Sequence, residues 1–116
     1  MGLDVGSVSF SYGGFNRFRE MLAKEIGYNL DDFEGFGGDK SFKEMKDDIK
    51  WLLDHSDCDG HITPKRCGRI APRLRDITKT WEKCGDSDKE WYRDMAVYLA
   101  EDMESCCKYN EPLVFR

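Results

Sequence analysis

The stretch from Asp54 to Cys67 most constrains how this chain can fold. Its centre is polar, and apolar residues recur at helical spacing on both sides of it. Gly60 suits a sharp turn. Thr63 is a good N-cap, and Pro64 stands at the first helical position, where no backbone donor is needed. The pattern predicts a helix-loop-helix centre, with one amphipathic helix on each side of a short loop.

The middle of this stretch resembles an EF-hand calcium loop. Asp57 and Asp59 fall on the third and fifth ligand positions when Gly60 is set at the sixth, where such a loop needs glycine. The ends depart from that pattern, because His55 stands where the first aspartate belongs and Arg66 where the bidentate glutamate belongs. Asp57 and Asp59 are therefore weak calcium ligands or, without a metal, acceptors of backbone N–H bonds in a hinge between the helices.

A zinc site is the second metal hypothesis for the same stretch. His55, Cys58, His61 and Cys67 offer two nitrogen and two thiolate ligands, the mixture that many structural zinc sites use. Their spacing is not that of a standard zinc finger, and Cys67 also fits the apolar face of the following helix. A degenerate EF-hand-like module that binds calcium or zinc is the alternative function for the chain.

The remaining pattern predicts a single, mainly helical α+β domain over residues 1–116. Alternating small polar and apolar residues indicate a strand at 7–12. The apolar tail at 113–115 is expected to pair with it, so that a small two-stranded sheet joins the termini. Pro72 is expected to kink or divide the third of about four helices. Those helices are predicted at 15–26, 41–54, 64–85 and from 87 onward.

Composition favours a folded cytoplasmic protein. The hydrophobic fraction of 40% argues against disorder. No apolar run approaches the roughly 20 residues that cross a bilayer, and the N-terminus lacks the pattern of a secretion signal. The five cysteines are odd in number and include no pair separated by two residues, which favours reduced thiols over a disulfide framework.

Charge is distributed unevenly along the chain. The segment 61–83 has seven lysine or arginine side chains against two carboxylates, so it carries +5. Because the whole chain has a net charge of −5, the remainder carries −10. Arg66, Arg69 and Arg73 lie at helical spacing within the basic segment, opposite its apolar face.

Two interpretations of these arginines follow. They pair internally with acidic residues of the last helix, or they form a docking surface for an acidic protein or nucleic acid. The net negative charge of the whole chain disfavours duplex DNA as the partner. The acidic residues available for internal pairing are Asp94, Glu101 and Asp102.

Two glycine-rich segments before predicted helices are candidates for holding an anionic nucleotide. Gly13-Gly14 precedes the first helix and Gly37-Gly38 the second. A helix N-terminus offers free N–H groups, and glycine lets an anion approach the backbone. Neither segment matches a P-loop or a Rossmann fingerprint. The residues expected to stack on or pair with such a ligand are Tyr12, Phe15, Arg17, Arg19 and Lys40.

Catalysis has little support in the sequence. No nucleophile elbow, metal-hydrolase helix motif or pair of catalytic acids can be recognised. Cys58 could meet His55 or His61 in space, but such pairs arise by chance in a chain with five cysteines and two histidines. We therefore expect a protein that is not an enzyme.

The chain as a whole resembles small uncharacterised phage or prophage proteins. The resemblance is carried by the Met1-Gly2-Leu3-Asp4 start, by Gly13-Gly14-Phe15, and by the run 53–60 with Thr63-Pro64 behind it. It supplies no named activity and no functional residues. It implies a small, non-enzymatic protein that inhibits or sequesters a host defence factor, by docking on a protein or by sequestering an anionic nucleotide.

Overall fold

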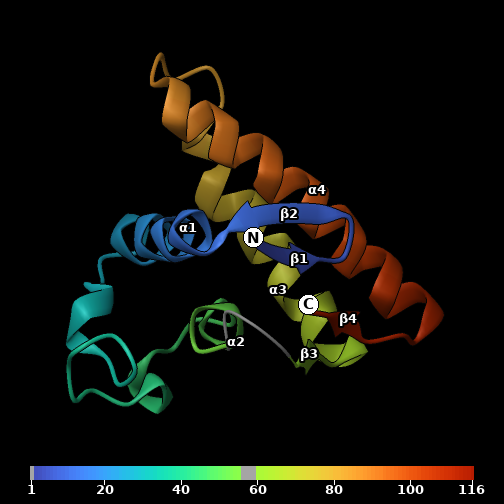
Figure 1. Ribbon diagram of the computed structural model, residues 1–116, viewed down its shortest axis with the longest axis horizontal. Helices are drawn as coiled ribbons and strands as arrows, with labels where there is room; N and C mark the ends of the chain where they lie inside the picture. The colour runs from blue at the N-terminus through green and yellow to red at the C-terminus, as the bar shows by residue number, and fades with distance from the viewer. Residues whose placement is uncertain (1, 56–59) are drawn as a thin grey trace.

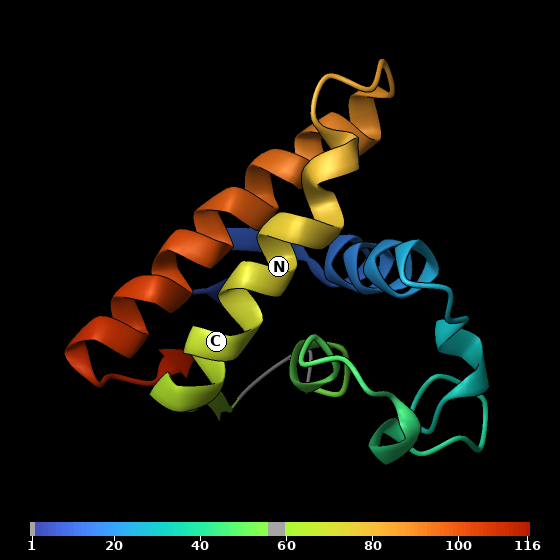
Figure 2. The same cartoon turned by 180° about the vertical axis from the view of Figure 1, so that it is seen from behind.

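Two long helices form the frame of the molecule. The computed structural model describes residues 2–55 and 60–116, with only the backbone at Tyr12. Helix α3 (Pro64–Thr78) and helix α4 (Ser87–Tyr109) run antiparallel and side by side (Figures 1 and 2). A short 3-10 turn, η3 (Lys79–Trp81), and Gly85 at φ +88° connect them. The predicted fold class, mainly helical α+β with about four helices and a small sheet, is confirmed.

Local chemistry explains where the two long helices begin and end. The Thr63 hydroxyl accepts a hydrogen bond from the Arg66 N–H, as predicted, and α3 continues through Pro72 as one helix. Pro72 is exposed, and because it has no N–H it leaves the carbonyl of Gly68 without the usual helical donor. Helix α4 is capped by the Asp86 carboxylate and ends at Asn110 in the left-handed conformation.

An N-terminal hairpin lies against the long helices. Strands β1 (Gly2–Val5) and β2 (Val8–Ser11) pair antiparallel, and alternate residues of both are buried. The predicted strand at 7–12 corresponds to β2, whereas β1 was not predicted. In the turn between the strands, Ser7 donates backbone and hydroxyl hydrogen bonds to Asp102 of α4. Helix α1 (Tyr12–Glu25) follows β2 directly.

The C-terminal tail joins two parts of the chain. Strand β4 (Leu113–Val114) pairs with β3 (His61–Ile62), which leads into α3. One residue further on, Phe115 forms a bridge with Val5, and the backbones of Asp4 and Arg116 exchange hydrogen bonds of 3.0 and 2.9 Å. The tail therefore reaches the N-terminal hairpin through β1, the predicted pairing with the strand at 7–12 is wrong, and its main partner is the strand before α3.

The segment 41–54 differs most from prediction. In place of one helix it forms a 3-10 turn, η2 (Phe42–Glu44), and a one-turn helix, α2 (Lys50–Leu53). The carboxylate of Asp47 accepts the N–H of Ile49 at 3.0 Å and the guanidinium of Arg73 at 2.7 Å. This local turn competes with a continuous helix. The apolar residues of the predicted helix are nevertheless all buried: Phe42, Met45, Ile49, Leu52 and Leu53.

Aromatic side chains fill the centre of the core. The ring of Phe18 stacks on Phe10 and Tyr92, with centroid separations of 5.4 and 5.8 Å, and meets the edge of Trp81 at 6.5 Å. These four rings come from β2, α1, η3 and α4, so one cluster ties the hairpin to three helical elements. In residues 2–55 and 60–116 no helix combines the length and the apolar character needed to cross a bilayer.

The Asp47–Arg73 pair predicts a defined pH dependence of stability. The Arg73 hydrogen bond lowers the pKa of Asp47 below its ordinary value of 3.8. A lowered folded-state pKa stabilises the fold above the unfolded-state pKa, and that contribution is lost as pH falls through the folded-state value. Asp47→Asn is expected to lower the free energy of unfolding by about 1.5 kcal/mol at neutral pH. The difference from the parent protein should fade as the pH falls through the lowered pKa of Asp47.

Denaturant titrations at several pH values measure this effect. Asp76→Asn is the matched control, because Asp76 contacts the same arginine at 3.5 Å but is 71% exposed. An exposed pair of this kind contributes at most about 0.5 kcal/mol. A destabilisation by Asp47→Asn that stayed constant from neutral pH into acid, where Asp47 is protonated, would contradict the assignment.

Candidate anion-binding surface

Trp51 lies at the centre of a cationic cluster. Its indole ring has the Arg66 guanidinium 5.1 Å from the centroid, the Lys50 ammonium at 5.6 Å and the Arg69 guanidinium at 6.0 Å. Cations at such distances interact favourably with the electron-rich face of an indole. We call Lys50, Trp51, Lys65, Arg66 and Arg69 the Trp51 surface.

Two short-range patterns place these side chains together. On α2, Leu52 and Leu53 point into the core, which leaves the half-buried Trp51 at the outer side. On α3, Arg66 and Arg69 stand at positions i and i+3 and are exposed, while Cys67 and Ile70 face the core. The packing of α2 on α3 therefore brings the indole of one helix to the arginines of the other.

A shallow cavity of about 270 Å³ lies within the Trp51 surface. Among the described residues it is lined by Trp51, Thr63, Lys65, Arg66 and Arg69, none of which carries a carboxylate. Within the part of the chain that the structure describes, no ion pair engages Lys50, Lys65, Arg66 or Arg69. Cations that gather without an acidic neighbour repel one another, and an anion placed among them relieves that repulsion.

Arg73 does not belong to this surface, although its spacing grouped it with Arg66 and Arg69. It forms hydrogen bonds of 3.0 and 2.7 Å with Asp47, and it contacts Asp76. Helix α3 does form an ion pair with the last helix, but through other residues than those predicted. Arg75 binds Glu104 at 2.8 Å, and among the described residues no ion pair joins α3 to Asp94, Glu101 or Asp102.

The first glycine-rich segment does not bring its predicted residues together. Phe15 is fully buried, and Arg17 points outward to a 3.4 Å contact with Asp88. Arg19 is only 3% exposed and donates hydrogen bonds to the Leu53 carbonyl at 3.1 Å and the His55 carbonyl at 2.6 Å. The side chain of Tyr12 lies outside the described part of the structure.

Arg19 therefore has a clear structural role. Its guanidinium lies 4.6 Å from the ring centroid of Phe15 and 4.9 Å from that of Phe36. The two carbonyls that it binds stand at and just beyond the C-terminus of α2, where backbone acceptors lack helical partners. Arg19 thus fastens the end of α2 to α1.

The second glycine-rich segment leads into η2, which is a three-residue 3-10 turn. The helix dipole on which the nucleotide hypothesis relied is therefore missing at this place. Gly38 has a packing explanation, since a Cβ there would come within 2.1 Å of the Asp32 backbone. Lys40 bridges Phe33 through its backbone, and its side chain is exposed.

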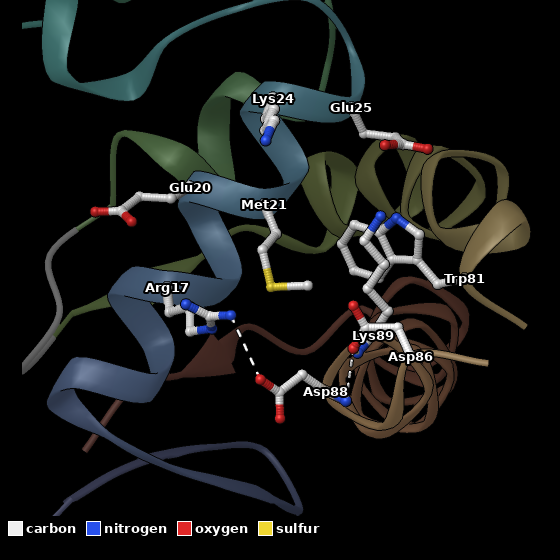
Figure 3. A pocket seen from close by; sticks show the side chains of 9 residues that line it. All are labelled: Arg17, Glu20, Met21, Lys24, Glu25, Trp81, Asp86, Asp88 and Lys89. Carbon is white, nitrogen blue, oxygen red and sulfur yellow. Dashed lines mark hydrogen bonds and ion pairs between the residues drawn. The ribbon is translucent and has the colours of Figure 1, made fainter. Parts of the chain in front are cut away.

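A second cavity, of about 310 Å³, lies between α1, η3 and the start of α4 (Figure 3). Figure 3 shows Met21 on one side of it and the indole of Trp81 on the other, with the Arg17–Asp88 contact below. The indole N–H of Trp81 is buried and has no hydrogen-bond partner among the described residues. The charged lining residues are Arg17, Lys24, Lys89, Glu20, Glu25, Asp86 and Asp88.

Both signs of charge line this second cavity, and carboxylates outnumber cations by four to three. Glu25 accepts a hydrogen bond from the Thr80 hydroxyl at 2.6 Å, and Asp86 caps α4. These carboxylates already have structural partners. The cavity therefore does not select a ligand of one charge, in contrast with the Trp51 surface.

The structure places some of the predicted metal ligands but not others. Asp57, Cys58 and Asp59 lie outside the described residues. The His55 ring stacks on Phe115 at 3.8 Å, and its Nε2–H donates to the His61 carbonyl at 3.0 Å. In residues 2–55 and 60–116 no group of three or more His, Cys, Asp or Glu side chains is placed to hold a metal ion.

Cys67, the fourth member of the zinc hypothesis, packs in the core. Its thiol is fully buried and contacts the Ile62 carbonyl, and burial raises its pKa to about 12. Zinc binds thiolate, so this environment opposes ligation by Cys67. Calcium or zinc binding by the remaining loop residues stays a prediction.

Trp51, Lys50 and Lys65 were not predicted as members of a site. A tryptophan beside Leu52 and Leu53 fits a core face as well as an outer one, and only the packing of α2 on α3 decides between them.

Comparison of the chain with models of known protein families, with curated proteins and with solved structures finds no match.

Proposed function

We propose that this chain is a non-enzymatic binding protein that captures an anionic protein partner on the Trp51 surface. The observation that supports it best is the gathering of Arg66, Arg69 and Lys50 around one indole ring, without an acidic partner among the described residues. Tryptophan and arginine are also the residue types that contribute most to binding energy at protein interfaces.

The distribution of charge supports a compact acidic contact in preference to a long polyanion. The basic segment 61–83 carries +5 within a chain of net charge −5. An acidic patch on a protein can contact the cations alone. Duplex DNA is long enough to lie against the negatively charged remainder of the chain as well, which would repel it. Sequestration of an anionic nucleotide has less support, since the first glycine-rich segment scatters its candidate residues and the second precedes no α-helix.

The biological setting that we propose comes from the resemblance to small phage proteins. In that setting the partner is a host factor, such as a defence protein, and the chain inhibits it by occupying the surface that it needs. Inhibition of this type requires no chemical step, in keeping with the expectation that the protein is not an enzyme.

Charge reversal tests the proposal directly. The double variant Arg66→Glu/Arg69→Glu, used as bait in a bacterial host lysate, is expected to lose its partner with at least about a 100-fold fall in affinity. Both side chains are exposed, so the thermal midpoint should stay close to that of the parent protein. Quantitative mass spectrometry of the captured proteins, followed by titration of the purified partner, gives the measurement.

The matched control is Lys79→Glu/Lys83→Glu. It makes the same change in net charge within the same basic segment, at exposed residues beyond α3. Capture by this control should persist, and capture by the parent protein should weaken as salt rises, because exposed charges are screened. Equal capture by the parent protein and the Arg66/Arg69 variant would place the interface elsewhere.

A further inference from the structure

We infer that the group held in the Trp51 surface is a phosphorylated side chain of the partner protein. This inference rests on the proposed function and names the chemistry that the same site recognises. The observations that carry it are the number of cations, the size of the cavity and the kind of cation that lines it.

Charge favours a phosphate monoester over a carboxylate. Three cations, Lys65, Arg66 and Arg69, line the cavity, and Lys50 lies 5.6 Å from the same indole ring. None of the four has an ion pair with a described residue. A carboxylate carries a single negative charge. A phosphorylated side chain carries about −1.5 to −2 at neutral pH and has three acceptor oxygens. The phosphate monoester therefore offsets more of the repulsion among these cations.

Geometry also favours the phosphate. Arg66 and Arg69 are one helical turn apart, and both guanidinium groups lie beside the same ring, which restricts their orientation. Each guanidinium can direct two parallel N–H donors at a tetrahedral group, and Lys65 lines the same cavity. A carboxylate offers two acceptor oxygens to the two forks, whereas a phosphate monoester offers three in a tetrahedral arrangement and carries more charge.

Size and lining favour a side chain over a nucleotide. The cavity of about 270 Å³ suits a single anionic head group. Trp51 is the only aromatic residue among the described residues of its lining, and cations already lie over its ring. A base would have to compete with these cations in order to stack on the ring.

Small molecules can distinguish a site for phosphate monoesters from one for carboxylates or nucleotides. We would titrate the parent protein with N-acetyl-phosphoserine amide, N-acetyl-glutamate amide and adenosine monophosphate, and follow the indole N–H of Trp51 and the Nε–H of Arg66 and Arg69 by NMR. The phosphoserine probe is expected to shift these signals at concentrations at least about tenfold lower than the glutamate probe. Adenosine monophosphate should bind no more tightly than phosphoserine.

Conservative variants test whether binding needs the paired N–H donors of the two guanidinium groups. Arg66→Lys/Arg69→Lys keeps both charges but removes the paired donors, so the phosphoserine probe should bind about tenfold more weakly. Equal binding of the glutamate and phosphoserine probes, or unchanged binding by the lysine variant, would overturn the inference. Binding of adenosine monophosphate at least about tenfold tighter than phosphoserine would assign the site to a nucleotide.

Phosphatase treatment of the lysate separates this inference from the proposed function. Treatment before capture is expected to abolish recovery of the partner. If capture survives the phosphatase but still requires Arg66 and Arg69, the partner is acidic without being phosphorylated, and only the inference fails. If capture does not require these arginines at all, the proposed function itself fails.

Discussion

Replacing Phe18 with alanine is expected to lower the free energy of unfolding by about 4 kcal/mol. The side chain is fully buried, and its ring lies within 5.4 to 6.5 Å of the rings of Phe10, Tyr92 and Trp81. The substitution removes buried apolar surface, leaves a cavity and breaks several aromatic contacts together. Because the neighbouring rings come from β2, η3 and α4, the surrounding structure has little freedom to collapse into the space.

Urea denaturation measures the effect, with Phe36→Ala as the matched control. Phe36 undergoes the same change in chemistry but is half-buried in a loop, so its loss should cost about 1.5 kcal/mol. The dependence of unfolding free energy on urea should be the same in both variants if each unfolds cooperatively. A loss below about 1 kcal/mol for Phe18→Ala would show that the aromatic cluster is not the centre of stability.

Replacing Arg19 with methionine is expected to cost about 3 kcal/mol. Methionine fills much of the same volume, but it cannot donate to the carbonyls of Leu53 and His55, which the guanidinium binds at 3.1 and 2.6 Å. The change also removes a cation from the faces of Phe15 and Phe36. Buried acceptors left without donors account for most of the expected loss.

Arg19→Lys is the informative companion to this variant. It keeps the charge but offers a single ammonium in place of a planar fork, so its stability should fall between those of the parent protein and Arg19→Met. Chemical denaturation gives the order of the three proteins. A methionine variant as stable as the parent would mean that the end of α2 does not depend on Arg19.

The parts of the fold that were predictable are those whose causes are local. Thr63 and Pro64 mark the start of α3, and the apolar spacing of residues 41–54 identifies the buried side chains in that segment correctly. The backbone conformation of the same segment was mispredicted, because a hydrogen bond from Arg73, 26 residues away, holds Asp47 in a turn. Strand β1 was missed for a similar reason, since a four-residue strand depends on the surface against which it packs.

In the candidate site, too, features with local causes were predicted and features that depend on distant residues were not. Helical spacing identified Arg66 and Arg69 as an exposed pair but wrongly added Arg73, whose partner lies in a distant loop. Arg19 was assigned to ligand binding on its charge and its place after Gly13-Gly14. Its position four residues after Phe15 and four before Ala23 puts it in line with two fully buried residues, and this spacing was a signal for burial.

The shortness of α2 has a consequence for binding. A helix of four residues has no stability of its own, so α2 depends on the burial of Leu52 and Leu53 and on Arg19. Trp51 lies on this helix, whereas Arg66 and Arg69 lie on α3. Under the proposed function, the affinity for a partner is scaled by the fraction of molecules in which α2 is docked. Local opening of this one turn, without global unfolding, would then be enough to release the partner.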